Sequence, residues 1–274
     1  MAALNTNVDI AYDRVGHGPT LVLLHPLGAD RFIWAPIVER LQDRRELITV
    51  DLPGFGESPP LEDTPTPRAL AAAVAELLGT IGVRGPHVTG ISLGGWVALE
   101  LGLTGVSQST TAIAPAGLWP EPLLPKPLVA HSLAHRFLPV VGALAASPPG
   151  RRMMLSRAVA HPGRVPGRDA THMVRAYALA PGFVAVNTAM RAGRFEALER
   201  IRGPLRLVWP EHDKLIRRPA WLPDNVRNVV LKDAGHIPVW DAPDALAEIL
   251  FTASENAIAS HARAPDALAS EAPR

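Results

Sequence analysis

Residues 86–95 read Pro-His-Val-Thr-Gly-Ile-Ser-Leu-Gly-Gly, and this stretch decides the fold class. The first part is a short apolar run typical of a buried strand, and a helix is expected over 93–103. At the junction, residues 90–94 match the pattern Gly-x-Ser-x-Gly. A strained turn here would lift the Ser92 hydroxyl clear of the sheet, with the helix dipole directed at developing negative charge. We predict Ser92 to be a nucleophile; the alternative is a tight turn without chemistry.

The chain on both sides of this stretch alternates strands with helices. Strands are expected at residues 20–27, 46–52, about 108–114, 205–209 and 228–231, and helices at 32–42, 65–81 and 243–252. This alternation predicts an α/β fold with a mostly parallel central sheet and helices on both of its faces. Residues 8–12, followed by the turn signal Gly16-His17-Gly18-Pro19, suggest an antiparallel edge hairpin.

Residues 118–203 interrupt the alternation. They show helical periodicity in pieces, at 128–146, 151–160, 169–180 and 184–200, and no convincing strand. We predict a helical cap inserted into an α/β core formed by residues 1–117 and 204–255. The tail from residue 256 to 274 is rich in Ala, Ser, Pro and charge, and is expected to be disordered.

Composition restricts the function further. The 274 residues are 47% hydrophobic and carry a net charge of +1, which is too small to favour a nucleic-acid partner. Because cysteine is absent, disulfides, a thiol nucleophile and thiolate-bound zinc are excluded. The N-terminus has no signal-peptide pattern, and no stretch approaches the roughly 20 apolar residues that span a bilayer. We expect a cytoplasmic protein without an integral membrane segment.

Five motifs in this order resemble those of the α/β-hydrolase fold superfamily, over residues 8–252. They are Leu24-His25-Pro26-Leu27-Gly28, Asp51-Leu52-Pro53-Gly54-Phe55-Gly56-Glu57-Ser58, Gly90-Ile91-Ser92-Leu93-Gly94, Pro210-Glu211-His212-Asp213 and Gly235-His236-Ile237-Pro238. The resemblance implies that the third motif is the nucleophile turn, the fourth carries the catalytic acid and the fifth carries the catalytic histidine. No cofactor is expected, and no spacing of histidines and carboxylates in the sequence indicates a metal site.

Ser92, Asp213 and His236 follow the chain order that this superfamily uses for nucleophile, acid and base. A serine hydroxyl needs an imidazole to take its proton during attack, and His236 fits that role. The imidazole needs an ionised carboxylate to fix its tautomer. Spacing from the preceding strand favours Asp213 for this, with Glu211 as the alternative.

The resemblance assigns the oxyanion hole to the backbone N–H groups of Leu27 and Leu93. Pro26 departs from the usual glycine and cannot donate, so it puts the detailed geometry of this loop in question. Pro210 also stands where glycine is common. His25 is expected to orient the loop through hydrogen bonds, with direct proton transfer as an alternative.

The substrate-pocket candidates are His25, Trp96 and Trp119. The tryptophans lie near the nucleophile in sequence and could equally be core residues. For the histidines of the predicted cap, solvated or packing roles are the default and substrate contact the alternative; these are His131, His135, His161 and His172.

Charge is the informative feature of the predicted cap. Residues 131–200 contain ten arginines against three acidic residues, a balance of +7. A solvated arginine-rich face is one interpretation. Pairing of one or two arginines with a substrate carboxylate is another, and attraction to an anionic membrane surface is a third. The expected partner is therefore a small-molecule substrate, which is anionic under the second interpretation; the oligomeric state is not predicted.

The leading hypothesis is a cofactor-independent serine hydrolase that cleaves a small ester or lactone through an acyl-enzyme on Ser92. Related enzymes that dehalogenate alkanes or open epoxides use an aspartate nucleophile, and Ser92 argues against both reactions. Alternatives within the fold are a C–C bond hydrolase and a perhydrolase or haloperoxidase-like enzyme. The alternative of another class is a ligand-binding or regulatory protein with little turnover.

Overall fold

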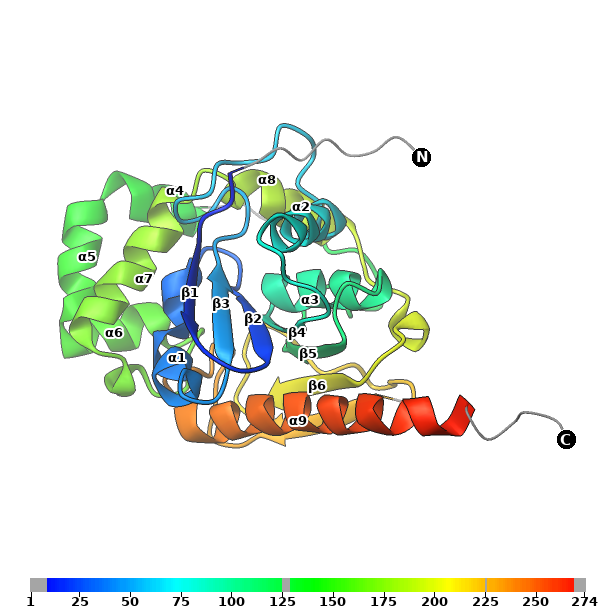
Figure 1. The fold of residues 1–274 in the computed structure, drawn as a ribbon. Coiled ribbons are helices and arrows are strands. Elements are labelled where there is room, and N and C mark those ends of the chain that lie inside the picture. Colours follow the sequence, from blue (N-terminus) through cyan, green and yellow to red (C-terminus); the bar gives the residue numbers. More distant parts are fainter. Residues whose placement is uncertain (1–8, 125–128, 225, 269–274) are drawn as a thin grey trace, which may run out of the picture.

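The computed structural model describes residues 9–124, 129–224 and 226–268, whose strands form one seven-stranded sheet between helices (Figure 1). The strand order is β1-β3-β2-β4-β5-β6-β7, and every neighbouring pair except β1–β3 is parallel. The strands are β1 (Tyr12–Gly16), β2 (Thr20–Leu24), β3 (Glu46–Val50), β4 (His87–Ile91), β5 (Ser109–Ile113), β6 (Leu205–Pro210) and β7 (Arg227–Leu231). The predicted α/β class with a mostly parallel sheet is confirmed.

Side chains of β2 alternate between two hydrophobic clusters, one on each face of the sheet. Val22 and Leu24 belong to the cluster under α2 (Pro67–Thr80) and α3 (Leu93–Leu103). Leu21 and Leu23 belong to the cluster under α1 (Ala35–Leu41), which follows the short 3-10 helix η1 (Arg31–Trp34), and α9 (Pro243–Leu268). Both faces are therefore covered, which explains why the strands read as continuous apolar runs rather than as alternating ones.

Strand β1 lies at the sheet edge but does not form the predicted hairpin with β2. It pairs antiparallel with β3, from Tyr12 opposite Val50 to Gly16 opposite Glu46, and it begins four residues later than expected. Gly16 has φ +85°, and a Cβ there would lie 2.3 Å from the carbonyl oxygen of Arg45. The turn after β1 therefore packs against the loop between α1 and β3. Through this turn the chain crosses the end of β3 and continues into β2, on the other side of β3.

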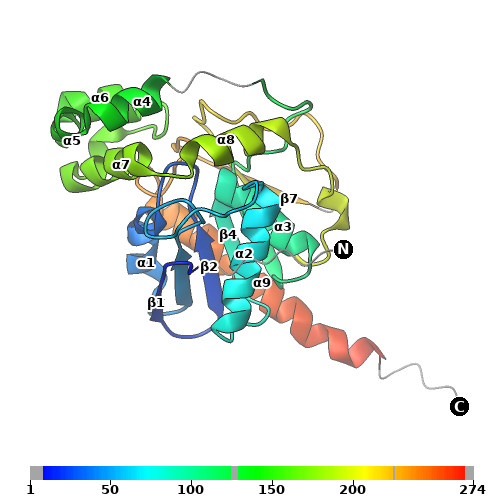
Figure 2. The same cartoon turned by 90° about the horizontal axis from the view of Figure 1, so that it is seen from above.

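Between β5 and β6 the chain forms helices and, within its described residues, no strand. They are α4 (Val129–Arg136), α5 (Leu138–Ala146), α6 (Pro148–Leu155), η2 (Pro162–Arg164), α7 (Gly167–Leu179), α8 (Phe183–Ala192) and η3 (Leu198–Arg200). We call this part the α4–α8 segment; Figure 2 shows α7 and α8 running across one end of the sheet. The predicted helix over 128–146 is broken at Phe137, since Pro139 in the first turn of α5 cannot continue a preceding helix.

The last helix, α9, continues to Leu268, past residue 252 where it was predicted to end. The expectation of a disordered tail is therefore wrong for residues 256–268, while 269–274 lie outside the described residues. Ala253 and Ala257 are buried, and alanine has the highest helix propensity, so the helix continues beyond its strongly apolar part.

No single helix among the described residues is long and apolar enough to cross a membrane. Helices α4 and α5 satisfy the length and composition criteria only when taken together, and they are bent by 94° at the break between them.

Candidate active site

Ser92 lies between β4 and α3, and its backbone has φ +55° and ψ −111°, a conformation that residues other than glycine rarely adopt. Its own N–H donates to the carbonyl of Ile113 on β5 at 2.9 Å. A Cβ at Gly90 would lie 2.0 Å from the carbonyl oxygen of Gly94, and one at Gly94 would lie 2.3 Å from that of Leu24. The glycines are thus required sterically, and the turn is held in a strained geometry of the kind that marks functional sites.

His236 and Asp213 are in direct contact. The Nδ1 atom of His236 lies 2.8 Å from Oδ2 of Asp213, and both side chains are only 5% exposed. Oδ1 of Asp213 accepts from the N–H groups of Leu215 and Ile216, which fixes the carboxylate. Donation from Nδ1 leaves Nε2 as the unprotonated nitrogen of the ring, as a general base requires.

Glu211, the alternative acid, has other partners. Its carboxylate contacts Lys232 at 2.7 Å and the N–H of Asp233 at 3.2 Å. These contacts lower the pKa of Glu211, the hydrogen bond from Lys232 being the main cause. The contact with His236 is made by Asp213, as predicted from the spacing.

Ser92, Asp213 and His236 follow the carboxyl ends of β4, β6 and β7, so the three residues belong to one edge of the parallel sheet. Within the described part of the chain, no hydrogen bond joins the Ser92 hydroxyl to the His236 ring. Such contacts are often long before substrate binds and close only in the complex. The joint action of the three residues therefore remains a prediction.

The loop after β2 carries the predicted oxyanion donor Leu27. Among the described residues, the N–H groups of Leu27 and Leu93 have no hydrogen-bond partner, as expected of donors kept for a ligand. Gly28 has φ +75°, and a Cβ there would meet the rings of Tyr177 on α7 and Phe183 on α8 at 2.7 and 3.0 Å. The α4–α8 segment thus packs directly on this loop.

His25 is fully buried, and both of its ring nitrogens are occupied. Nδ1 donates to the carbonyl of Pro26 at 2.8 Å, and Nε2 accepts from the N–H of Leu52 at 2.9 Å. Burial lowers its pKa, which favours the neutral ring that this pattern needs. The proposal of His25 as a substrate-pocket residue is wrong because no ring nitrogen is free, whereas its expected contact with the loop carbonyl is present.

The two tryptophan pocket candidates also have structural contacts. Trp96 is 4% exposed, belongs to the core and donates from its indole to Glu100 at 3.0 Å. Trp119 packs edge-on against Trp96 and donates to the carbonyl of Gly193 at 2.8 Å. Trp96 is therefore a core residue, and Trp119 connects the end of the α4–α8 segment to it.

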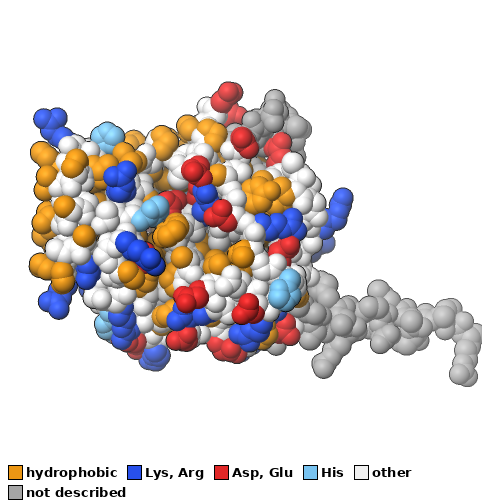
Figure 3. Space-filling model, turned by 60° about the vertical axis from the view of Figure 1, so that its left-hand side comes forward, with side chains coloured by type: hydrophobic (Ala, Val, Ile, Leu, Met, Phe, Trp, Pro, Cys, Tyr) orange, Lys and Arg blue, Asp and Glu red, His pale blue; other side chains and the backbone are white. Residues whose placement is uncertain are grey.

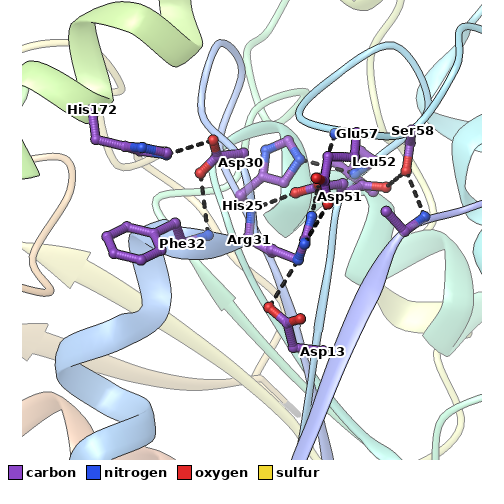
Figure 4. A network of polar contacts seen from close by, with 11 residues as sticks. Asp13, His25, Asp30, Arg31, Phe32, Asp51, Leu52, Glu57, Ser58 and His172 are labelled. Carbon is purple, nitrogen blue, oxygen red and sulfur yellow. Dashed lines mark hydrogen bonds and ion pairs between the residues drawn. The ribbon is translucent and has the colours of Figure 1, made fainter.

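A contact between Asp30 and His172 was missed from the sequence (Figure 4). Oδ2 of Asp30 lies 2.7 Å from Nε2 of His172 on α7, while Oδ1 accepts from the N–H of Phe32. The hydrogen bond to Asp30 raises the pKa of His172. Burial alone would raise the pKa of Asp30, but the hydrogen bond from His172 lowers it overall. The residues are 142 positions apart, so no local pattern could have paired them.

Asp51, in the second motif, organises the loop after β3 (Figure 4). Its buried carboxylate accepts from the N–H groups of Arg31 at 2.6 Å and Glu57 at 2.9 Å, and it also forms an ion pair with the Arg31 guanidinium. The Ser58 hydroxyl donates to the Asp51 carbonyl at 2.8 Å. These contacts connect the loops after β2 and β3 and give the motif a structural role.

Two open grooves flank the loop that carries Asp213. One, of about 300 Å³, is lined by Glu211, Arg217, Arg218 and their neighbours, and the other, of about 390 Å³, by His161, His212, Lys214 and their neighbours. Ser92 and the ten arginines of residues 131–200 line neither groove, so pairing of those arginines with a substrate carboxylate remains a prediction. In the described ranges, no group of three or more histidine and acidic side chains is arranged to hold a metal ion.

Curated proteins similar to this chain include three kinds of hydrolase. An epoxide hydrolase from Mycobacterium tuberculosis is 29% identical over 206 residues, which cover 66% of this chain and 91% of that protein. A pimeloyl-[acyl-carrier protein] methyl ester esterase from Aeromonas salmonicida is 38% identical over 97 residues, or 35% and 37% of the two chains. A 3-oxoadipate enol-lactonase from Acinetobacter baylyi is 32% identical over 108 residues, or 38% and 40%. The last two matches span well under half of either protein.

Solved structures share the whole fold. The enol-lactonase from Burkholderia xenovorans superposes with a TM-score of 0.72 at 21% identity, covering 92% of this chain and 99% of that one. A thermophilic esterase from Thermogutta terrifontis superposes with a TM-score of 0.67 at 21% identity, covering 91% of this chain and 94% of that one. The sequence profile of the alpha/beta hydrolase family matches residues 21–249. With that match over most of its length, the chain belongs to the alpha/beta hydrolase family and has the hydrolase fold that its motifs predicted.

Proposed function

We propose that this protein is a cofactor-independent serine hydrolase that cleaves a small ester or lactone. The observation that carries the proposal is the contact of His236 Nδ1 with Asp213 Oδ2 at 2.8 Å, at the sheet edge that also carries Ser92. This contact holds the imidazole in the tautomer whose Nε2 can accept a proton. The similarity to an ester esterase and to enol-lactonases supports the choice of bond.

In the proposed reaction, Ser92 Oγ attacks the substrate carbonyl carbon and its proton passes to His236 Nε2. The oxyanion accepts hydrogen bonds from the N–H groups of Leu27 and Leu93, each worth on the order of 10²–10³ in rate. When the carbon–oxygen bond breaks, the leaving alkoxide takes the proton from His236. A water molecule then gives a proton to His236 Nε2 and attacks the acyl carbon. The bond from that carbon to Ser92 Oγ breaks, the acid leaves, and His236 returns the proton to Oγ.

Epoxide hydrolysis is the second candidate, because a match that covers 66% of this chain is to an epoxide hydrolase. Opening an epoxide on a carboxylate forms an ester that water can cleave, whereas opening it on Ser92 would form a stable ether. We therefore expect turnover of esters or lactones and none of epoxides.

The test compares the purified protein with its Ser92→Ala variant on p-nitrophenyl acetate, butyrate and octanoate, on a γ-lactone and on styrene oxide. Intact mass after reaction with a fluorophosphonate reports the nucleophile independently of substrate. We expect ester or lactone turnover to fall at least about 10⁴-fold in the variant and labelling to disappear.

Ser132→Ala is the matched control, since Ser132 is an exposed serine on α4. It should keep both turnover and labelling. A folded wild-type protein that is not labelled would contradict the proposal and favour a binding protein. Turnover of styrene oxide that survives in Ser92→Ala would contradict it in favour of another nucleophile.

A further inference from the structure

Exposed apolar side chains concentrate on helices α4–α6. Of the fourteen large hydrophobic side chains exposed among the described residues, five lie on these three helices and a sixth, Phe137, lies at the break between α4 and α5. They are Val129 (59% exposed), Leu133 (51%), Phe137 (49%), Val140 (60%), Leu144 (43%) and Met153 (68%). Isolated exposed apolar residues are common, but a gathering of them marks an interaction surface. We call these six residues the apolar face; none of them belongs to the site described above.

The apolar face is the outer side of an amphipathic layer. On α5, Gly142 and Ala145 are buried, and the Thr171 hydroxyl of α7 donates to the Gly142 carbonyl at 3.1 Å. Val140 and Leu144, on the opposite side of the same helix, stay exposed. The side of α5 toward α7 is therefore buried by contacts within the protein, whereas the outer side contacts no other part of the described chain.

Helices α4, α5 and α6 carry three arginines, Arg136, Arg151 and Arg152, and no aspartate or glutamate. Residues 122–168 contain no aspartate or glutamate, whereas Lys126 and six arginines lie in this range. Arg136 and Arg152 are exposed on α4 and α6, beside the apolar face. In Figure 3 the part of the surface at the far left, formed by these helices, carries hydrophobic and basic side chains, while acidic ones gather elsewhere.

We propose that the α4–α6 face binds the surface of an anionic lipid bilayer. A helix with exposed apolar side chains and adjacent arginines binds in the headgroup region of a bilayer. The apolar side chains insert there, and the arginines pair with lipid phosphates. Helices of eight and nine residues joined at 94° lie flat on such a surface and are far too short to cross it one by one. A second copy of this chain fits less well, because two such faces would bring cationic side chains against each other.

The test is flotation of the full-length protein with vesicles of phosphatidylcholine alone and of phosphatidylcholine with about 30% phosphatidylglycerol. We expect binding only to the anionic vesicles, and loss of that binding at about 0.5 M salt. Using Ser92→Ala protein throughout separates binding from any turnover of lipid, so the outcome does not depend on the proposed function.

Two pairs of variants examine the two components of the surface. Phe137→Ser with Val140→Ser should weaken binding by at least about tenfold, whereas Trp221→Ser, 76% exposed outside the α4–α8 segment, should not change it. Arg136→Gln and Arg152→Gln should each weaken it about fivefold. Arg217→Gln and Arg218→Gln, on the groove beside Asp213, are their controls. Because every substituted side chain is exposed or lines an open groove, the far-UV spectrum and Tm should match the wild type.

Three results would overturn the proposal. The first is no binding to anionic vesicles, and the second is binding that the α4–α6 variants leave unchanged. The third is a dimer in analytical ultracentrifugation that Phe137→Ser with Val140→Ser dissociates, which would assign the face to a second copy.

Discussion

The carboxylate of Asp241 accepts a hydrogen bond from the backbone N–H of Gly235 at 2.8 Å, directly before His236 in the chain. The same carboxylate accepts from the N–H groups of Ala160 at 2.7 Å and His161 at 2.8 Å. Asp241 is 4% exposed, and a Cβ at Gly235 would lie 2.5 Å from the nitrogen of Ala160. One buried carboxylate therefore connects the His236 loop to the segment that follows α6.

Replacing Asp241 with Asn should destabilise the protein and slow the proposed reaction. An amide group turns an NH₂ toward at least one of the N–H donors and leaves it unsatisfied, at a cost of about 1–3 kcal/mol in the free energy of unfolding. Because even a small displacement of His236 would misalign it for proton transfer, we expect kcat to fall by about tenfold or more. Urea unfolding and steady-state kinetics measure the two effects.

Asp244→Asn is the matched control for this prediction. Asp244 is 88% exposed and pairs with Arg40 at 2.6 Å, so its loss should cost less than about 1 kcal/mol and leave kcat unchanged. Equal effects of the two substitutions would show that Asp241 does not position the loop.

Asp213→Asn and Glu211→Gln should differ strongly in their effects. The first replaces the acceptor for His236 Nδ1 and favours the wrong tautomer, so kcat should fall about 10⁴-fold. The second weakens contacts of Glu211 with Lys232 and with the N–H of Asp233, neither of which involves His236, and should leave kcat within about twofold. Hydrolysis of a p-nitrophenyl ester measures both, and an equal loss in the two variants would contradict the assignment of Asp213.

The contact of Asp30 with His172 should make stability depend on pH. The pKa of His172 is raised in the folded protein, so its contribution is complete below the ordinary value of about 6.5 and is lost as pH rises through the folded pKa. The pKa of Asp30 is lowered, so its contribution is present above about 3.9 and is lost as pH falls through the folded pKa. The contact should stabilise most between about pH 4 and 6.5.

Asp30→Asn tests this because asparagine can still cap η1 through Phe32. Since the His172 side chain is 43% exposed, the difference in unfolding free energy from wild type should not exceed about 1 kcal/mol. It should shrink as pH rises through the raised pKa of His172 in the folded protein. A double-mutant cycle with His172→Gln isolates the pair, and a coupling that does not vary with pH would exclude an ionic origin.

Gly182→Ala should destabilise the packing of the α4–α8 segment on the loop after β3. Its Cβ would lie 2.8 Å from Cα of Gly54, and the N–H of Gly182 donates to the Gly54 carbonyl at 2.9 Å. Because backbone rather than a flexible side chain must move, we expect a loss of about 1–3 kcal/mol in thermal or urea unfolding.

Gly79→Ala in α2 is the control, because nothing lies within 4 Å of the added Cβ. Alanine is the better helix former, so this variant should be more stable by up to about 1 kcal/mol. Destabilisation of both variants to the same extent would show that the close approach of Gly54 and Gly182 is not the cause.

The order of strands and helices followed from local patterns, because each strand reads as a short apolar run and each helix repeats its apolar face every three to four residues. The turn at Ser92 also followed from the sequence, since two glycines flanking a serine between a strand and a helix permit few other geometries. The choice of Asp213 over Glu211 rested on spacing from β6, and the contact with His236 agrees with it.

Other features depend on contacts between distant parts of the chain. No local pattern relates the residues involved in these contacts. Examples are the pairing of β1 with β3, the hydrogen bond of His25 with Leu52, the packing of Trp96 in the core and the contact of Asp30 with His172. The three donors to Asp241 are backbone N–H groups, which carry no sequence signal at all. The sequence by itself determined the family, the fold class and the candidate chemical groups. Only the tertiary structure decided which groups face one another, because that depends on how the loops at the sheet edge and the α4–α8 segment pack together.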